Sequence, residues 1–212
     1  LSGSAISEEN NEQEIAYGFT GDCLFNNLEV RKSGEDIAER AKNLLKGKSL
    51  KTGIYNILVP PYVSVEFLSV MSSLFLSSNI RKGKSLFMNY KKGDFIGREI
   101  LNIKDNAILD YRYGSFPVDG EGEKAKEKYV VEKGRLNTFL YDKLNAKFFN
   151  LQTTGNSIRG SYKELPDVGV SNFYIERGET KKENIENRER FAVSYTHLRA
   201  HETSLHLVCR RL

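Results

Sequence analysis

The sequence contains no tryptophan, four prolines and two cysteines, and its three histidines, His197, His201 and His206, all lie near its end. Outside this C-terminal stretch, Cys23 is the one cysteine. A single cysteine excludes a disulfide framework and suits a reducing cytoplasm. There is no unbroken apolar run of about 18 residues, so we expect no membrane span. The chain opens on Leu1 without a basic or apolar leader, so we expect no signal peptide. Without an initiator methionine it is expected to be a fragment.

The overall composition is that of a globular protein. Of the 212 residues, 39% are hydrophobic and 28% are charged, which excludes collagen, a coiled coil and a fully disordered chain. The length fits one large domain or two small ones. The formal net charge of +4 is too small to indicate nucleic-acid binding.

Hydrophobic periodicity predicts both helices and strands. We expect a helix from Ser33 to about residue 47, a helix over 62–78 with Pro61 in its first turn, and a short helix over 142–149. Residues 1–13 are expected to form a loop. The expected strands are 15–25, 54–59, 97–102, 107–113, 128–132, 136–141 and 171–176, with a hairpin turn at 132–135. Mixed helices and strands followed by a strand-rich half predict an α+β fold.

The chain is expected to divide into four parts. Residues 1–94 form an α/β part with two amphipathic helices, 95–178 a β-rich part, 179–191 a charged linker or helix, and 192–212 a tail. The peptide at 192–203 is typical of translated sequencing-adapter read-through, so we expect the tail to have no role in the function. The alternative is a natural basic tail.

The tail carries a motif that resembles a zinc site. His201, Glu202 and His206 spell HExxxH. Two histidines five residues apart lie roughly 140° apart on a regular helix, whereas zinc-binding helices use a spacing of four. We therefore expect no zinc site in the tail.

Three other features of the first 191 residues lack the residues that would make them functional sites. Gly-Lys-Ser occurs at 47–49 and 83–85, but neither copy has the upstream glycine of a phosphate-binding loop, so nucleotide binding is not predicted. Cys23 has no histidine to activate it. The serine-rich face of the 62–78 helix is interpreted as a small-residue packing face.

Two glycine-containing loops are the candidate contact sites. The loops at 114–122 and 153–160 can approach a ligand or another chain closely, or serve as structural turns. Asp119, Glu121 and Glu123 could hold a divalent cation, although such acidic turns are more often solvated. The candidate contact residues for a peptide or a partner are Asp119, Glu121, Gly122, Thr154, Gly155, Asn156 and Arg159.

Motifs around these loops resemble a known family. The acidic turn 119–122 and the hairpin 129–136 are similar to those of the TldD/PmbA family. So are the stretch at 140–147, the Thr-Thr-Gly-Asn loop at 153–156 and the strand at 171–178. Their order agrees over residues 14–178. The resemblance implies a middle portion of a longer chain.

The resemblance also implies proteolysis. In the family, two related subunits form a cytoplasmic complex that degrades or matures peptides. The TldD-type subunit carries HExxxH and the zinc, and the PmbA/TldE-type subunit does not. Aligned on Arg81-Lys82-Gly83, the family motif falls on residues 68–73, where Leu68, Ser69 and Ser73 replace its ligands and carboxylate.

The leading hypothesis is therefore a cytoplasmic PmbA/TldE-like subunit, not catalytic alone, with no cofactor of its own. Its expected partners are a zinc-bearing TldD-type subunit and a peptide substrate. One alternative is an active metallopeptidase whose metal ligands lie in a missing C-terminal part. Another is a stand-alone peptide-binding scaffold.

Overall fold

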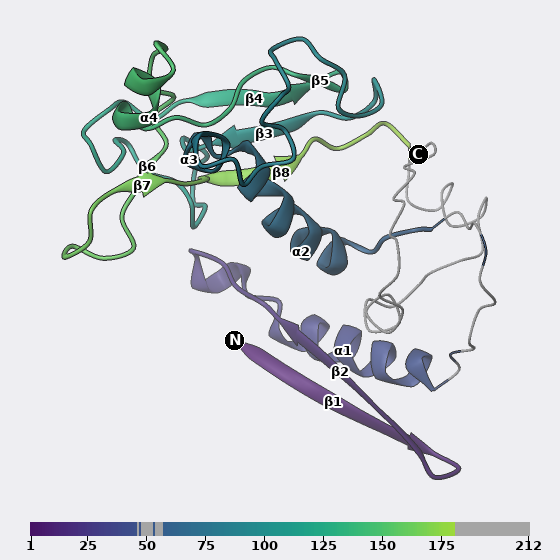
Figure 1. The fold of residues 1–212 in the computed structure, drawn as a ribbon. Helices are drawn as coiled ribbons and strands as arrows, with labels where there is room; N and C mark the ends of the chain where they lie inside the picture. Colours follow the sequence, from purple (N-terminus) through teal and green to yellow (C-terminus); the bar gives the residue numbers. More distant parts are fainter. Residues whose placement is uncertain (46, 48–52, 54–56, 181–212) are drawn as a thin grey trace.

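The chain begins with a β-hairpin that is covered on one face by a helix. The computed structural model describes residues 1–45, 47, 53 and 57–180 (Figure 1). Strands β1 (Ser2–Glu9) and β2 (Glu12–Phe19) pair antiparallel. A short helical turn, η1 (Phe25–Asn27), leads to helix α1 (Val30–Leu44), whose buried Ile37 and Ala41 pack with Ala16 of β2.

The hairpin corrects the predicted loop over residues 1–13 and shortens the predicted strand over 15–25. Asn10 and Asn11 have φ angles of 51° and 66°, which asparagine tolerates and a tight hairpin turn requires. Helix α1 also begins at Val30 rather than Ser33, and Glu29 at its N-cap makes no side-chain capping bond.

The predicted helix over 62–78 is broken in two. Helix α2 (Pro61–Ser72) begins with proline in its first turn, as expected, and continues into the short η2 (Ser73–Phe75). Leu76 is extended, and α3 (Ser77–Arg81) follows. The break occurs because the chain pairs with a distant segment here: Leu140 donates from its N–H to the Phe75 carbonyl at 2.9 Å.

Four antiparallel strands form the main sheet in the order β5-β4-β3-β8. They are β3 (Ile103–Asn106), β4 (Glu127–Glu132), β5 (Arg135–Leu136) and β8 (Asn172–Ile175). The strands predicted over 128–132 and 171–176 and the hairpin turn between β4 and β5 are confirmed. The strands predicted over 97–102 and 107–113 are wrong, because those residues form turns on either side of β3, and the strand predicted over 136–141 shrinks to the short β5.

Short elements complete the second part of the chain. Helix α4 (Lys143–Phe148) confirms the predicted short helix, and Asp142 caps it by accepting from the Asn145 N–H at 2.7 Å. Strands β6 (Ser157–Ile158) and β7 (Asp167–Val168) form a separate two-stranded ladder. The observed mixture of helices and antiparallel sheets confirms the α+β class.

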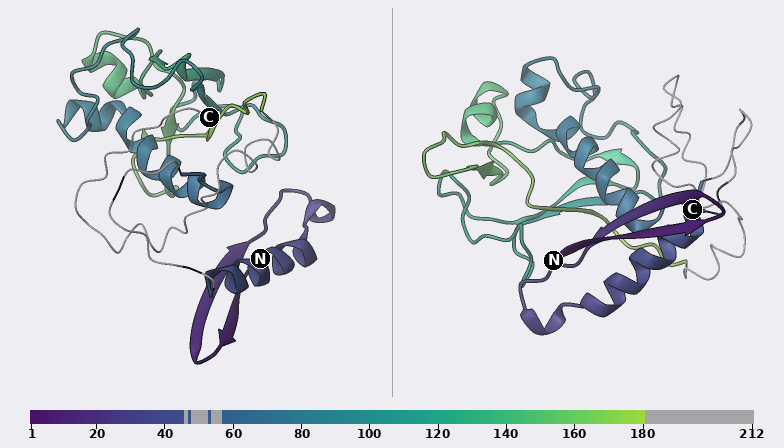
Figure 2. Two further views of the ribbon diagram at one scale, coloured as in Figure 1. Left: turned by 90° about the vertical axis from the view of Figure 1, so that its right-hand side faces the viewer. Right: turned by 90° about the horizontal axis from the view of Figure 1, so that it is seen from below.

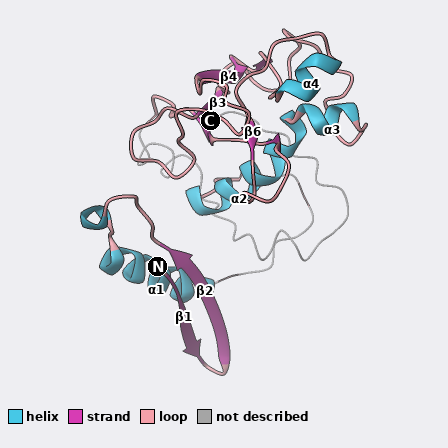
Figure 3. Cartoon of the chain, turned by 90° about the vertical axis from the view of Figure 1, so that its left-hand side faces the viewer, coloured by secondary structure: helices cyan, strands magenta, loops and turns pink. Residues whose placement is uncertain are grey.

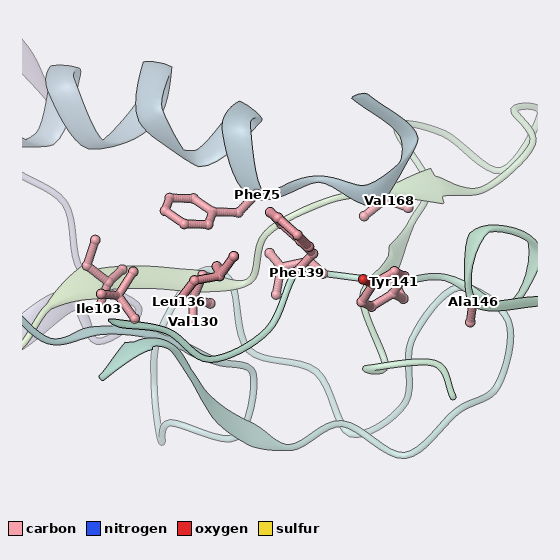
Figure 4. Close-up of a cluster of buried hydrophobic side chains, with 10 residues drawn as sticks. Phe75, Ile103, Val130, Leu136, Phe139, Tyr141, Ala146 and Val168 are labelled. Atoms are coloured by element: carbon pink, nitrogen blue, oxygen red, sulfur yellow. The ribbon is translucent and has the colours of Figure 1, made fainter. Parts of the chain in front are cut away.

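The main hydrophobic core joins η2 and α3 to the sheet (Figure 4). Phe75 lies in this core with side chains of β3, β4 and β5, and it is fully buried. The left view of Figure 2 and Figure 3 show the hairpin and α1 apart from the main sheet. Arg40 of α1 lies with its guanidinium carbon 4.6 Å from the ring centre of Tyr62 in α2. The predicted division at residue 94 stays a prediction.

Several predictions concern residues outside the described part. Residues 54–56 of the predicted strand over 54–59, most of the charged segment 179–191 and all of the tail 192–212 lie there. The read-through origin of the tail thus stays a prediction. Among the helices that the structure describes, none has both the length and the apolar character to span a bilayer.

Candidate functional site

The two candidate loops meet in space although they are far apart in the sequence. The N–H of Gly120 donates to the carbonyl of Ser157 at 2.7 Å. In return the N–H of Ser157 donates to Asp119 Oδ2 at 3.1 Å. The acidic loop and the Thr-Thr-Gly-Asn loop thus form one connected surface unit, which we call the joined loops (residues 119–123 and 153–159).

Asp119 organises the acidic loop. Its side chain is buried, and Oδ1 accepts from the N–H groups of Glu121 and Glu123, both at 2.9 Å. A carboxylate that accepts several backbone N–H groups fixes a turn. The structure therefore places Asp119 beneath the contact surface that was predicted for it.

The other two acidic side chains point to helix α4. Glu121 Oε2 accepts from the Lys143 N–H at 2.9 Å, and Glu123 pairs with Lys143 Nζ at 3.0 Å. Pairing with Glu123 raises the pKa of Lys143. Glu121 and Glu123 thus both bind Lys143, whereas Asp119 binds backbone N–H groups. Among the described residues, no group of three or more His, Cys, Asp or Glu is placed to hold a metal ion.

Three residues shape the second loop. Thr154 Oγ1 accepts from the Tyr141 N–H at 2.7 Å. Gly155 has φ of +69°, and a Cβ there would lie 3.0 Å from the Lys124 carbonyl, so glycine is needed. Asn156 is fully buried. The loop is therefore held from inside, and little of it faces solvent.

The anchor of Asn156 is a buried ion pair that sequence reasoning missed. Lys128 Nζ lies 2.9 Å from Asp105 Oδ2 and 2.9 Å from Asn156 Oδ1. Asn156 Nδ2 donates to the same Asp105 oxygen at 2.7 Å. Burial lowers the pKa of Lys128, and its attraction to Asp105 opposes that shift. No local pattern marks this pair, because its members come from different strands.

The exposed part of the joined loops is small and polar. Gly122 and Arg159 are exposed, and Arg159 Nε donates to the Gly120 carbonyl at 3.3 Å. Beside them lies an open hollow of about 350 Å³. Its lining residues are Glu123, Lys143, Ala146, Lys147, Asn150, Leu151 and Thr153. Such a surface offers hydrogen bonds and a shallow apolar contact.

The residues at the expected position of the family's zinc motif are not suited to binding the metal. The window 68–73 lies in α2 and the start of η2. Ser72 and Ser73 there donate their hydroxyls to the carbonyls of Ser69 and Val70, both at 2.7 Å. The window has no imidazole, thiol or carboxylate, the groups that zinc prefers, so no catalytic step is assigned to it.

A second ionic cluster in the sheet gives a pH prediction. Lys104 Nζ lies 2.7 Å from Glu127 and 2.7 Å from Glu176, and Tyr129 also donates to Glu176. The hydrogen bond from Lys104 holds the pKa of Glu176 below its ordinary value of 4.5. A lowered carboxyl pKa stabilises the fold above the ordinary pKa, and that stability is lost as the pH falls through the lowered value.

We therefore expect Glu176→Gln to destabilise the protein at neutral pH and to matter progressively less below pH 4.5. Urea unfolding of both proteins at about pH 7 and about pH 3 measures this, since the stability difference between them should shrink in acid. A difference that stays constant, or grows, would contradict the assignment. Glu132→Gln, at an exposed position on β4, is the matched control.

Comparisons with known proteins agree on one family. A model described as "PmbA/TldA metallopeptidase C-terminal domain" matches residues 52–201. A metalloprotease TldD homolog of Buchnera aphidicola is 34% identical over 105 residues, which are 50% of this chain and 22% of that protein. A zinc metalloprotease TldD homolog of Saccharolobus solfataricus is 26% identical over 157 residues, or 74% of this chain and 35% of that protein.

A solved structure shares the fold. The crystal structure of TldE from Thermococcus kodakarensis matches with a TM-score of 0.75 at 18% identity, over 85% of this chain and 41% of that one. At this identity the likeness concerns the fold alone. The chain spans about a fifth to two fifths of the length of these three proteins.

Proposed function

Because the chain belongs to the PmbA/TldA (TldD/PmbA) family of metallopeptidases, we propose that it serves as the zinc-less subunit of a two-subunit peptidase complex. Relatives named as TldD metalloproteases place the family in a peptidase system. In the proposal, a TldD-type paralogue supplies the zinc and the hydrolysis. This chain shapes the complex and contacts the partner or the peptide. A cytoplasmic location belongs to the same proposal.

One observation carries the proposal: the residues at the position of the family motif do not suit zinc. Leu68, Ser69 and Ser73 stand there, and residues 1–191 contain no histidine at all. Because the second fact does not depend on the alignment, a shift of one or two residues leaves the argument unchanged.

The joined loops are the proposed contact surface. Arg159 and Gly122 are exposed there, while Asp119, Gly155 and Asn156 act from beneath by holding the loops in place. Glu121 and Thr154 lie half-buried between them. A rigid polar surface of this kind suits polypeptide binding, because the contact loses little conformational entropy.

Co-purification tests the proposal. The full-length protein, carrying an affinity tag, is co-expressed with the TldD-type paralogue of the same genome, and we expect the two to purify together. Arg159→Glu should weaken the complex about tenfold, as expected for loss of a significant interface contact. Arg112→Glu, at another exposed arginine, is the matched control and should leave the complex unchanged.

The two alternatives give different results. A complete protein that stays alone in the presence of its paralogue would favour the stand-alone scaffold. An active metallopeptidase would bind zinc without a partner. Equal effects of Arg159→Glu and Arg112→Glu would overturn the placement of the contact surface at the joined loops, even if the complex forms.

A further inference from the structure

We propose that Asp105, Lys128 and Asn156 form a positioning cluster that holds the joined loops in one conformation. This inference rests on the proposed function, and it identifies the residues that fix the conformation of the proposed contact surface. The cluster joins β3, β4 and the second loop. Lys128 lies 23 residues from Asp105 and 28 residues from Asn156 in the sequence. None of the three side chains would touch a partner.

Asn156 is the member of the cluster that connects the ion pair to the loop. Its Nδ2 donates to Asp105 Oδ2 at 2.7 Å and to the Gly169 carbonyl at 3.0 Å. Its Oδ1 accepts from Lys128 Nζ at 2.9 Å and from Thr154 Oγ1 at 2.7 Å. Two donated and two accepted bonds fill the hydrogen-bonding capacity of the amide, so the side chain has one orientation.

Asp105 connects the same cluster to Ser171, the residue directly before β8. Its side chain is fully buried, and Oδ1 accepts from the Ser171 N–H at 2.7 Å. The next residue after Asn156, Ser157, exchanges hydrogen bonds with Asp119 and Gly120. A displacement at the cluster would therefore reach both loops through consecutive bonds.

The burial of two charged side chains, Asp105 and Lys128, favours a positioning role over a purely stabilising one. The Lys128 side chain is 9% exposed and that of Asp105 is 0% exposed. Removing both charges from water carries a large desolvation penalty, and apolar replacements of buried pairs are often as stable or more so. A fully satisfied buried network does, however, restrict the chain to one arrangement. The inference is that this chain keeps the pair for the shape of the loops.

Hydrogen exchange of the full-length protein tests this inference. In the double variant Asp105→Asn with Lys128→Met, both buried charges disappear together. We expect amides of residues 154–157 and 119–123 to exchange about tenfold faster or more, while the melting temperature changes little. Unchanged exchange in these segments would overturn the inference.

Two further variants keep the test decisive. Lys104→Met is the matched control, because it removes a lysine of β3 that pairs with Glu127 and Glu176 outside the cluster. It should leave exchange in the joined loops unchanged. Asn156→Ala cuts the link and leaves the ion pair in place, so it should reproduce the local acceleration even if the double variant fails to fold. Normal exchange in Asn156→Ala would contradict the role given to its amide.

Binding of the TldD-type subunit separates this inference from the function it rests on. If the loops exchange faster and the affinity falls about tenfold or more, both stand. If the loops exchange faster and the affinity is unchanged, the positioning role stands and the contact surface of the proposed function is overturned.

Discussion

Replacing Asp105 by alanine is expected to lower the free energy of unfolding by about 3–5 kcal/mol, the range for breaking one half of a buried ion pair. The substitution leaves the Lys128 ammonium, which is 9% exposed, without its carboxylate. It also removes the acceptor of the Ser171 N–H and of the Asn156 amide. Three donors would then lose a partner in a site with little access to water.

Urea unfolding at neutral pH measures the loss. Asp110→Ala, at an exposed position in the turn after β3, is the control and should cost less than about 0.5 kcal/mol, as exposed sites usually do. Asp105→Asn combined with Lys128→Met should recover most of the stability, because no unpaired charge remains. A loss below about 1 kcal/mol for Asp105→Ala would contradict a buried, paired carboxylate.

Phe75→Ala is expected to cost about 3–5 kcal/mol, the range for deleting a large buried aromatic side chain. Phe75 is 0% exposed, and its ring centre lies 5.2 Å from that of Phe87 and 5.9 Å from that of Phe173. It therefore connects the helical segment to β8 of the sheet. Its removal leaves a cavity where the two layers meet.

Thermal unfolding and urea unfolding both report this loss. Phe25→Ala offers a matched control, because Phe25 is 84% exposed and should change stability by about 0.5 kcal/mol or less. Equal effects of the two substitutions would show that η2 and the sheet do not share a core.

Local signals in the sequence predicted the elements that depend on near neighbours. Pro61 marked the start of α2, and the short helix predicted over 142–149 corresponds to α4. The turn between β4 and β5 was predicted from Glu132 to Arg135. Each of these rests on residues within a few positions of one another, so the sequence alone carries the information.

The errors arose where distant residues decide the conformation. The break at Leu76 depends on pairing with Leu140, and Gly97 bonds to the Gly134 carbonyl instead of entering a strand. The hairpin of β1 and β2 is a different case, because its turn at Asn10-Asn11 is local. A polar strand shows little hydrophobic alternation by itself.

The candidate site divides in the same way. The sequence identified both loops, yet it could not show that Ser157 bonds to Asp119 and Gly120. It also could not reveal that Asp105 and Lys128 lie beneath them, because strand register brings these residues together. The sequence alone therefore could not distinguish the exposed residues of the loops from the buried residues that hold them in place.

The central claim is that this chain works as a zinc-less subunit, and zinc content together with peptidase activity tests it most directly. The full-length protein and its TldD-type paralogue are purified separately and then mixed. We predict zinc in the paralogue alone, no peptide hydrolysis by the isolated full-length protein, and hydrolysis in the complex. Zinc binding and full peptidase activity in the isolated protein would contradict the account.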